Sequence, residues 1–418
     1  MEIELTKLRD LMTLVKPVMH KKAAIKATQC IYIGEGKAVV TDLETMVITD
    51  MPGATEPLLL PYYSIADTLK FIPGSKLIIE PRGQKMVALI WDEGSASYPT
   101  EDVQTFPVLP ELMVKAEGDL DGDSLVTELA AALPYASEED SKPILKGVTL
   151  TLGNPIEIAA SNGMRMAHRV LPQSFPVEEK VIIPSQSVGI LGYVFTKTPR
   201  TPPSTADSLV QAVTAKRPVH TSLLDTGKIR FDFGKTSVII KLVQGQPPNF
   251  ISVIPKGDPT LQSQIFAPQL EAAVKRARAI AKDSKDVVRM VFAGGKLTLS
   301  AYGGDQELTT TMDTIITQGE PGKIAMPCTQ LLEFLAGKTG IITFSIHGDN
   351  APVVLESGQG PRILISPMAV QWDGDKPPAE TPAPEPVEEN PESPEDETDV
   401  QEGVEEEEQE EEEPAATE

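Results

Sequence analysis

PYYSIADTLKFI (61–72), PSQSVGILGYVF (184–195) and PCTQLLEFLAGK (327–338) are three versions of one stretch of sequence. In each, a proline precedes a short run of apolar residues with helical spacing, which predicts a short helix. The stretches lie one domain length apart, since a typical domain has ~100–150 residues. This spacing predicts a domain present three times in tandem, because the repeat unit of a solenoid is much shorter.

Two further landmarks repeat in phase with these prolines. Upstream of each proline lie two alternating strands around a polar turn, at 37–50, 156–170 and 296–313. Earlier still lie amphipathic helices, at about 4–19, 123–136 and 267–282. Each copy therefore consists of helix, strands, helix and strands, which predicts an α+β fold.

Proline-punctuated segments at 106–119 and 247–259 separate the copies. We expect domains at residues 1–117, 118–256 and 257–372. The second domain is the longest because residues 196–226 resemble an inserted loop, with a short helix at 206–214.

The negative charge is concentrated at the C-terminal end of the chain. The net charge is −24, and residues 373–418 hold 21 acidic side chains and one lysine, so residues 1–372 are nearly neutral. The acidic segment is rich in proline and glutamate and has too few apolar residues to bury a core, which predicts a disordered tail. It is either a solvating appendage or a polyanion that competes with nucleic acid for a basic surface.

Several functional classes find no support in the sequence. No apolar run reaches the ~18 residues that span a bilayer, and Cys30 and Cys328 stand in different copies, as expected of reduced buried thiols. Two Gly-Lys-Thr tripeptides (234–236 and 337–339) lack the upstream glycine of a phosphate-binding loop. The four histidines have no second ligand at metal-binding spacing. We expect a cytoplasmic protein without cofactor, metal or catalytic site.

Basic side chains gather on two of the three opening helices. Lys275, Arg278 and Lys282 recur at helical spacing opposite an apolar stripe, and Lys21 and Lys22 follow the first opening helix. A single basic helix face is usually just solvated. Two in equivalent positions of a repeat favour a shared surface that binds a polyanion.

The second opening helix departs from this pattern. Between Lys115 and Lys142 the sequence has eight acidic side chains and no base. If the three helices line one surface, its middle third is poor in positive charge, and Lys142 is the cation that follows the helix there.

The most distinctive motifs lie in the second and third copies. They are SKPILKGVTLTLG (141–153), AASNGMRMAHRVLP (159–172), VRMVFAGGKLTLSA (288–301), GEPGKIAMPCTQLLEFL (319–335) and RILISPMAV (362–370). FPVLP (106–110) and PPNFISVIP (247–255) match the strands that close the first two domains. On these motifs, residues 1–370 resemble the bacterial DNA sliding clamp, the beta subunit of DNA polymerase III, with a looser match in the first copy.

The resemblance implies a head-to-tail homodimer of three-domain protomers, closed into a ring with helices lining the hole and antiparallel sheets outside. Such a ring is a processivity factor without an active site: it encircles duplex DNA of any sequence and tethers the replicative polymerase, the clamp loader and repair proteins through short peptides. It is associated with the nucleoid. The phosphate-facing cations would be Lys21, Lys22, Lys142, Lys275, Arg278 and Lys282.

The resemblance also implies a partner pocket between the second and third copies. Its residues would be Leu145, Ser161, Gly163, Met164, Arg165, Met166, Pro248, Val253, Leu364, Ile365, Ser366, Pro367 and Met368. Methionine, leucine and valine side chains form an adaptable apolar groove of the kind that accepts peptides. Ordinary core packing is the alternative for any one of them, except Arg165, which needs a carbonyl or carboxylate partner in an apolar strand pair.

The protomer contact implied by the family would use Phe106 and Ile280. In the alternative, the Phe106 side chain simply packs within its own domain.

Some positions depart from the family pattern. Met164, Ser252 and Ala369 stand where the family often has histidine, a basic residue and arginine, and an acidic segment follows the usual terminus. These departures leave open which partners bind, and whether the chain is a main clamp, a paralogue or a virus-encoded clamp. The alternative function is a clamp-fold scaffold that binds peptides without encircling DNA.

Overall fold

The computed structural model describes residues 1–107, 113–199, 217–282, 285–358 and 360–372. By internal contacts the chain divides into two units, Met1–Val370 and Gln371–Glu418. The acidic tail expected at 373–418 lies outside the described residues, as do residues 200–216 of the expected insert and its short helix at 206–214. The bounds 196–226 expected for the insert are too wide, because residues 196–197 end a helix and residues 218–224 form a regular strand of the second copy.

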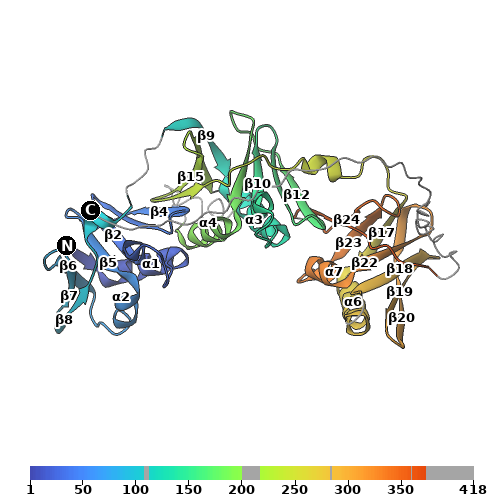
Figure 1. Cartoon of the computed structure of the whole chain (residues 1–418), viewed down its shortest axis with the longest axis horizontal. Coiled ribbons are helices and arrows are strands. Elements are labelled where there is room, and N and C mark those ends of the chain that lie inside the picture. Colours follow the sequence, from blue (N-terminus) through green and yellow to red (C-terminus); the bar gives the residue numbers. More distant parts are fainter. Residues whose placement is uncertain (108–112, 200–216, 283–284, 359, 373–418) are drawn as a thin grey trace, which may run out of the picture. The chain divides into compact units, whose positions relative to one another are not determined.

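The three copies have the same order of elements (Figure 1). The first copy comprises β1 (Glu2–Glu4), α1 (Leu5–Val15), β2 (Cys30–Gly34), β3 (Lys37–Thr41), β4 (Thr45–Asp50), β5 (Leu58–Pro61), α2 (Tyr62–Thr68), β6 (Lys76–Pro81), β7 (Met86–Trp91) and β8 (Gly94–Pro99). The second comprises β9 (Val114–Asp121), α3 (Gly122–Ala132), β10 (Gly147–Leu152), β11 (Ile156–Ser161), β12 (Arg165–Leu171), β13 (Glu179–Pro184), α4 (Ser185–Lys197), β14 (Pro218–Leu224), β15 (Lys228–Phe233) and β16 (Thr236–Lys241).

The third copy adds one strand to this pattern. It comprises β17 (Leu261–Phe266), α6 (Ala267–Ala281), β18 (Val287–Ala293), β19 (Lys296–Gly303), β20 (Gln306–Asp313), β21 (Ile315–Gly319), β22 (Gly322–Pro327), α7 (Cys328–Leu335), β23 (Ile341–Ile346), β24 (Val353–Glu356) and β25 (Arg362–Ile365). The extra strand, β21, pairs with β17.

The predicted landmarks correspond to these elements. The opening helices are α1, α3 and α6, and short 3-10 turns, Lys16–Val18 and Leu133–Tyr135, extend the first two. The three prolines end strands β5, β13 and β22 and serve as N-caps of α2, α4 and α7. Proline suits both roles, because its fixed φ fits the extended backbone and the missing N–H is needed by neither the strand end nor the helix start.

All strand pairs are antiparallel, and they join neighbouring copies. One sheet has the order β5-β2-β3-β4-β16-β15-β14-β9, and another has the order β13-β10-β11-β12-β25-β24-β23-β17-β21. In the first, β4 of copy one pairs with β16 of copy two; in the second, β12 of copy two pairs with β25 of copy three. Each of these sheets therefore crosses from one copy into the next.

Two four-stranded sheets remain, with the orders β1-β6-β7-β8 and β20-β19-β18-β22. The strand β8 is the counterpart of β16 and β25, and β20 is the counterpart of β4 and β12. In the described residues, β8 and β20 each lie at the edge of a sheet with one side unpaired.

The opening helices bury one face each. On α1 the buried stripe is Leu5, Leu8, Leu11, Met12 and Val15. On α6 it is mainly alanine, with Leu270 and Val274, and small side chains let α6 pack closely against α7. Both stripes follow the predicted helical spacing, and Lys275 and Arg278 on the other side of α6 are exposed.

Both cysteines are free and buried, as predicted. Burial raises the pKa of the Cys30 thiol and raises the pKa of Cys328 to about 12. Neither is a reactive thiolate at neutral pH.

Candidate peptide pocket and nucleic-acid surface

A tight turn between β11 and β12 forms one wall of a pocket. The Ser161 hydroxyl donates to the Arg165 carbonyl at 2.8 Å and accepts from the Gly163 N–H at 3.0 Å. The Asn162 side-chain oxygen accepts from the N–H groups of Met164 and Arg165, both at 3.0 Å. Gly163 has a φ of 94°, which glycine adopts without strain. These bonds fix the turn, so Met164 is held in place on the surface.

The pocket lies where β12 pairs with β25 and encloses about 200 Å³. Its lining is Leu145, Ser161, Gly163, Met164, Arg165, Met166, Pro248, Asn249, Phe250, Val253, Pro352, Leu364 and Ser366. Met166 and Leu364 are buried beneath it, whereas Met164 and Val253 are 46% and 50% exposed. Exposed apolar side chains above an apolar floor suit a ligand that brings its own apolar groups.

The structure brings ten of the thirteen predicted pocket residues together in this lining. Ile365, Pro367 and Met368 do not line it: Ile365 is buried opposite Arg165 in the ladder, and the Met368 N–H donates to the Ala325 carbonyl. Sequence reasoning missed Asn249, Phe250 and Pro352. Phe250 stands in the predicted closing segment 247–255, where an aromatic residue between prolines was an available signal.

Arg165 links the second and third copies. Its guanidinium donates to the Pro134 carbonyl at 2.9 Å, forms an ion pair with Glu333 of α7 and lies over the Tyr135 ring at 5.3 Å from the centroid. The carbonyl and carboxylate partners expected for a half-buried arginine are therefore both present. Burial lowers the pKa of Arg165 and raises the pKa of Tyr135 to about 12. Both groups keep their protons at neutral pH.

We expect Arg165→Met to lower the free energy of unfolding by about 2 kcal/mol, because a charged donor to a carbonyl contributes roughly 1.5–3 kcal/mol. Glu333→Gln removes only the half-exposed carboxylate and should cost less than about 1 kcal/mol. Urea unfolding of the two variants beside the parent protein measures both values. Equal losses would show that the ion pair, and not the carbonyl contact, holds Arg165.

The six predicted phosphate-facing cations lie on equivalent elements of the three copies. Lys21 and Lys22 follow α1, Lys142 follows α3, and Lys275, Arg278 and Lys282 lie on α6 or at its end. Lys142 pairs with Glu139 at 2.7 Å, Lys275 pairs with Glu271 at 2.7 Å and Arg278 lies 3.4 Å from Asp286. The basic side chain of each pair is largely exposed, which weakens the pair, so the cations remain available to an anion.

Part of the negative charge on the second opening helix is directed into its own copy. Glu128 of α3 is buried and lies 3.2 Å from Arg169 of β12, and burial raises the pKa of its carboxyl. Asp121 caps α3 by accepting from the Ser124 hydroxyl at 3.0 Å. These two carboxylates are therefore engaged within the chain, and α3 is less repulsive toward an anion than its sequence suggests.

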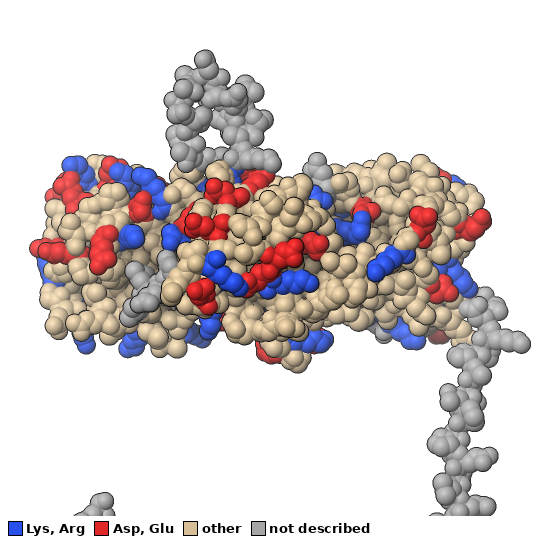
Figure 2. Space-filling model, turned by 90° about the horizontal axis from the view of Figure 1, so that it is seen from above, with Lys and Arg blue, Asp and Glu red and all other residues tan. Residues whose placement is uncertain are grey.

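On the face of the molecule shown in Figure 2, basic and acidic side chains lie interspersed. Such a mixed face attracts neither a polyanion nor a polycation over a long range. This distribution makes the opening helices and the loops after them the better candidates for a nucleic-acid surface.

The two residues predicted for the protomer contact pack inside this chain. Phe106 is 8% exposed, with its ring 5.4 Å from that of Tyr32 and packed in a cluster with Met46 and Ile239. Because Ile239 lies on β16, Phe106 packs at the junction of the first and second copies within its own chain, and not in its own domain alone. Ile280, near the end of α6, packs against the core. A role for either residue between protomers stays a prediction.

Among the residues that the structure describes, no cluster of three or more His, Cys, Asp or Glu side chains is arranged to hold a metal ion. Within the same residues, no helix is both long and apolar enough to cross a membrane.

No protein-family model matches the chain. It is 24% identical over 325 residues to the beta sliding clamp homolog GriR of Streptomyces muensis, covering 74% of this chain and 81% of that protein. It is 22% identical over 350 residues to the beta sliding clamp of Caulobacter vibrioides, covering 79% of this chain and 88% of that one.

Solved structures of the same fold agree with these sequence relatives. The beta subunit of the DNA polymerase of Streptococcus pyogenes superposes with a TM-score of 0.77 at 19% identity, covering 88% of this chain and 99% of that one. A DnaN sliding clamp from Pseudomonas aeruginosa bound to griselimycin gives a TM-score of 0.75 at 19% identity, with the same coverage. Sequence and fold together identify the present chain as a divergent relative of the bacterial beta sliding clamp, the beta subunit of DNA polymerase III.

Proposed function

We propose that the chain is a DNA polymerase processivity factor: two copies close head to tail into a ring that encircles duplex DNA and slides along it. The observation that carries this proposal is the pair of unpaired edge strands, β8 and β20. Within the chain, the counterparts of β8 are β16 and β25, and the counterparts of β20 are β4 and β12. Here β16 pairs with β4, and β25 pairs with β12. Pairing β20 of one chain with β8 of a second continues this pattern.

Head-to-tail pairing of this kind either closes or grows into a filament. In a closed dimer both copies of β8 and both copies of β20 are paired, which removes these four open edges, and an open edge invites aggregation. Such a dimer contains six copies of the repeated unit. We propose limits of 1–117, 118–256 and 257–372 for the three domains of each chain.

The opening helices are proposed to face the DNA. The cations on α6 and after α1 and α3 would meet phosphates, and phosphate contacts fix a protein on the duplex without selecting a sequence. A ring held by such contacts retains DNA and still permits sliding. It needs no catalytic site or cofactor of its own, and it belongs in the cytoplasm, with the nucleoid.

The pocket beside Met164 is proposed to bind short peptides of the polymerase, the clamp loader and repair proteins. Its exposed Met164 and Val253 and buried floor offer apolar contacts, and the fixed turn presents backbone groups that can orient a peptide. The Pseudomonas aeruginosa sliding clamp that was solved with griselimycin supports a binding groove in this fold.

The proposal is tested by two measurements on the full chain. Native mass spectrometry should give a dimer, and electron micrographs of that species should show a closed ring. A ring placed on nicked circular DNA should stay on it and be lost when the DNA is cut to a linear form. A strict monomer, or equal loss from circular and linear DNA, would exclude an encircling clamp and favour a peptide-binding scaffold.

We expect the double substitution Met164→Ser and Val253→Ser to weaken griselimycin binding at least roughly tenfold, because the two side chains are the exposed apolar walls of the pocket and each lost apolar contact weakens binding. The matched control is Met86→Ser with Val291→Ser, which removes one methionine and one valine of similar exposure elsewhere. Isothermal titration of the three proteins measures the difference. Equal affinities would remove the pocket from the proposal.

A further inference from the structure

A second turn in the chain repeats the hydrogen bonds of the pocket turn. The Thr41 hydroxyl donates to the Thr45 carbonyl at 3.0 Å and accepts from the Leu43 N–H at 2.9 Å. The Asp42 carboxylate accepts from the N–H groups of Glu44 at 3.0 Å and Thr45 at 2.6 Å. Residues 41–45 therefore correspond one by one to residues 161–165.

The strand pairing next to the two turns also corresponds. Thr45 lies opposite Ile240 and Met46 opposite Ile239 in the β4 to β16 ladder, just as Arg165 lies opposite Ile365 and Met166 opposite Leu364 in the β12 to β25 ladder. The junction between the first and second copies is thus built on the same scaffold as the junction that carries the peptide pocket.

This first junction holds a pocket of its own, of about 130 Å³. Its lining is Thr41, Leu43, Glu44, Thr45, Met46, Pro107, Lys228, Ile239 and Lys241. Met46 and Ile239 are buried beneath it, as Met166 and Leu364 are buried beneath the other pocket. We call it the junction pocket, to distinguish it from the Met164 pocket.

Leu43 is in a strained conformation that exposes its side chain to this pocket. Its φ is 80°, in the left-handed region that disfavours branched side chains, and it is 51% exposed. The corresponding residue of the other turn is Gly163, at a φ of 94°. Glycine would suit the backbone of either turn, so folding does not explain a leucine here. Strain of this kind is typical of positions that serve binding.

Two lysines provide the charge of the junction pocket. Lys228 and Lys241 lie directly opposite each other in the β15 to β16 ladder, an arrangement in which like charges repel. In the described residues neither forms an ion pair, although Glu44 also lines the pocket. A bound carboxylate would relieve the repulsion between them.

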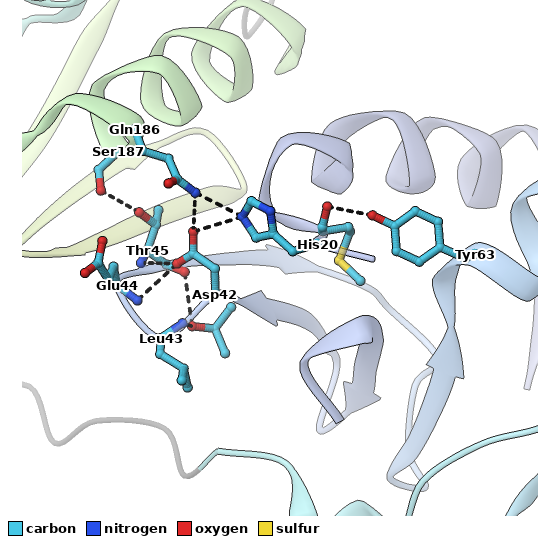
Figure 3. A network of polar contacts seen from close by, with 10 residues as sticks. His20, Asp42, Leu43, Glu44, Thr45, Tyr63, Gln186 and Ser187 are labelled. Atoms are coloured by element: carbon cyan, nitrogen blue, oxygen red, sulfur yellow. Dashed lines mark hydrogen bonds and ion pairs between the residues drawn. The ribbon is translucent and has the colours of Figure 1, made fainter. Parts of the chain in front are cut away.

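The turn is held rigidly from the second copy, as Figure 3 shows. Gln186 of α4 donates to the Asp42 carboxylate at 3.1 Å and lies 2.9 Å from His20, and the hydroxyls of Thr45 and Ser187 are 2.7 Å apart and buried. The second oxygen of Asp42 is thereby engaged across the junction. A wall fixed in this way loses little entropy when a ligand binds.

We propose that the junction pocket binds a short segment of a partner protein in which an apolar side chain is flanked by carboxylates. The apolar side chain packs on Leu43, Met46 and Ile239, and the carboxylates lie between Lys228 and Lys241. This site is additional to the Met164 pocket and does not depend on the encircling of DNA. The acidic segment 373–418 has valine as its largest aliphatic side chain and no leucine, isoleucine, methionine or aromatic residue, so it fits this apolar floor poorly.

The test uses a fluorescein-labelled peptide with the sequence Ser-Glu-Asp-Leu-Asp-Glu-Ser, titrated with the full chain and followed by fluorescence anisotropy. Leu43→Gly and the double variant Lys228→Ser with Lys241→Ser should each weaken binding at least tenfold. Leu43→Gly should unfold at the same temperature as the parent or higher, since glycine suits the turn, so its loss of binding cannot come from misfolding. Unchanged affinity in both variants overturns the proposal.

Three controls separate the other outcomes. Lys235→Ser changes an exposed lysine at the opposite end of the same hairpin and should leave binding unchanged. Loss of binding in the Met164→Ser and Val253→Ser variant would place the peptide in the Met164 pocket and overturn the assignment. A tenfold gain on ending the chain after Trp372 would show that the chain's own acidic segment occupies the junction pocket, and would overturn the choice of a partner protein.

Discussion

Thr309→Pro should convert the proposed dimer into a monomer while leaving the fold intact. Thr309 lies on β20, opposite Ser300 of β19. The Thr314 N–H donates to the Gly295 carbonyl, and N–H directions alternate along a strand, so the Thr309 N–H points away from β19, toward the unpaired edge. Proline at this position therefore removes no backbone hydrogen bond within the chain. It loses only the exposed contact of 3.4 Å between the Thr309 and Ser300 hydroxyls, which a valine would lose as well.

The same substitution blocks a strand that pairs from outside. It removes a donor from the proposed ladder with β8 of the second chain and places a ring where that strand would approach, which is why proline is confined to free edges of sheets. We expect association to weaken by roughly 100-fold or more, given about 1.4 kcal/mol for each factor of ten. Analytical ultracentrifugation across a dilution series measures the change.

Thr309→Val is the matched control, because it keeps the N–H and a β-branched side chain on the strand. It should remain dimeric. A proline variant that is as dimeric as the valine variant would show that the ring does not close through β20. A proline variant that unfolds early would instead show that this edge is already paired within the chain.

Replacing Lys275, Arg278 and Lys282 with glutamate should shorten retention on nicked circular DNA at least roughly tenfold. These side chains lie on the exposed side of α6 or at its end. Each phosphate contact contributes about 0.9 to the slope of the logarithm of the binding constant against the logarithm of the salt concentration. Losing three contacts should therefore flatten that slope by about 2.7. Retention measured at several salt concentrations gives both quantities.

The control carries the same change in net charge at other sites. Lys180, Lys235 and Lys256 are exposed lysines away from the opening helices, and their replacement with glutamate should alter retention only slightly. Equal losses in the two triple variants would mean that overall charge, and not the face of α6, governs retention. No loss in either would exclude the opening helices as the DNA surface.

Local pattern was sufficient to predict most elements of this fold. The apolar spacing of Leu5, Leu8 and Val15 defined the buried side of α1, and the alternating stretch 156–170 defined β11 and β12. These signals arise within a few residues and depend on geometry that is the same in every protein. Pairing between copies is different, because β12 and β25 are about two hundred residues apart and no local spacing specifies their register.

The candidate site shows the same division. Met164, Arg165 and Met166 follow each other along one strand and its turn, so a motif could place them. Phe250 and Pro352 join them only because separate segments pack together in space. The sequence shows Glu128 only as one carboxylate of an acidic helix. In the structure it is buried beside Arg169 of β12. Local spacing in the sequence does not specify such a partner. Leu43 carries no signal in the sequence, because its backbone conformation, and not its side-chain type, sets it apart.

The ladders that cross from copy to copy also determine how the proposed ring would fail under load. At each junction inside a chain, the copies are joined twice, by a backbone ladder and by the polypeptide that connects them. A junction between chains has the ladder alone. Tension from DNA leaving the hole, or torque from a clamp loader, would therefore open the proposed ring between β8 and β20 first. The junctions inside each chain would stay closed under the same load.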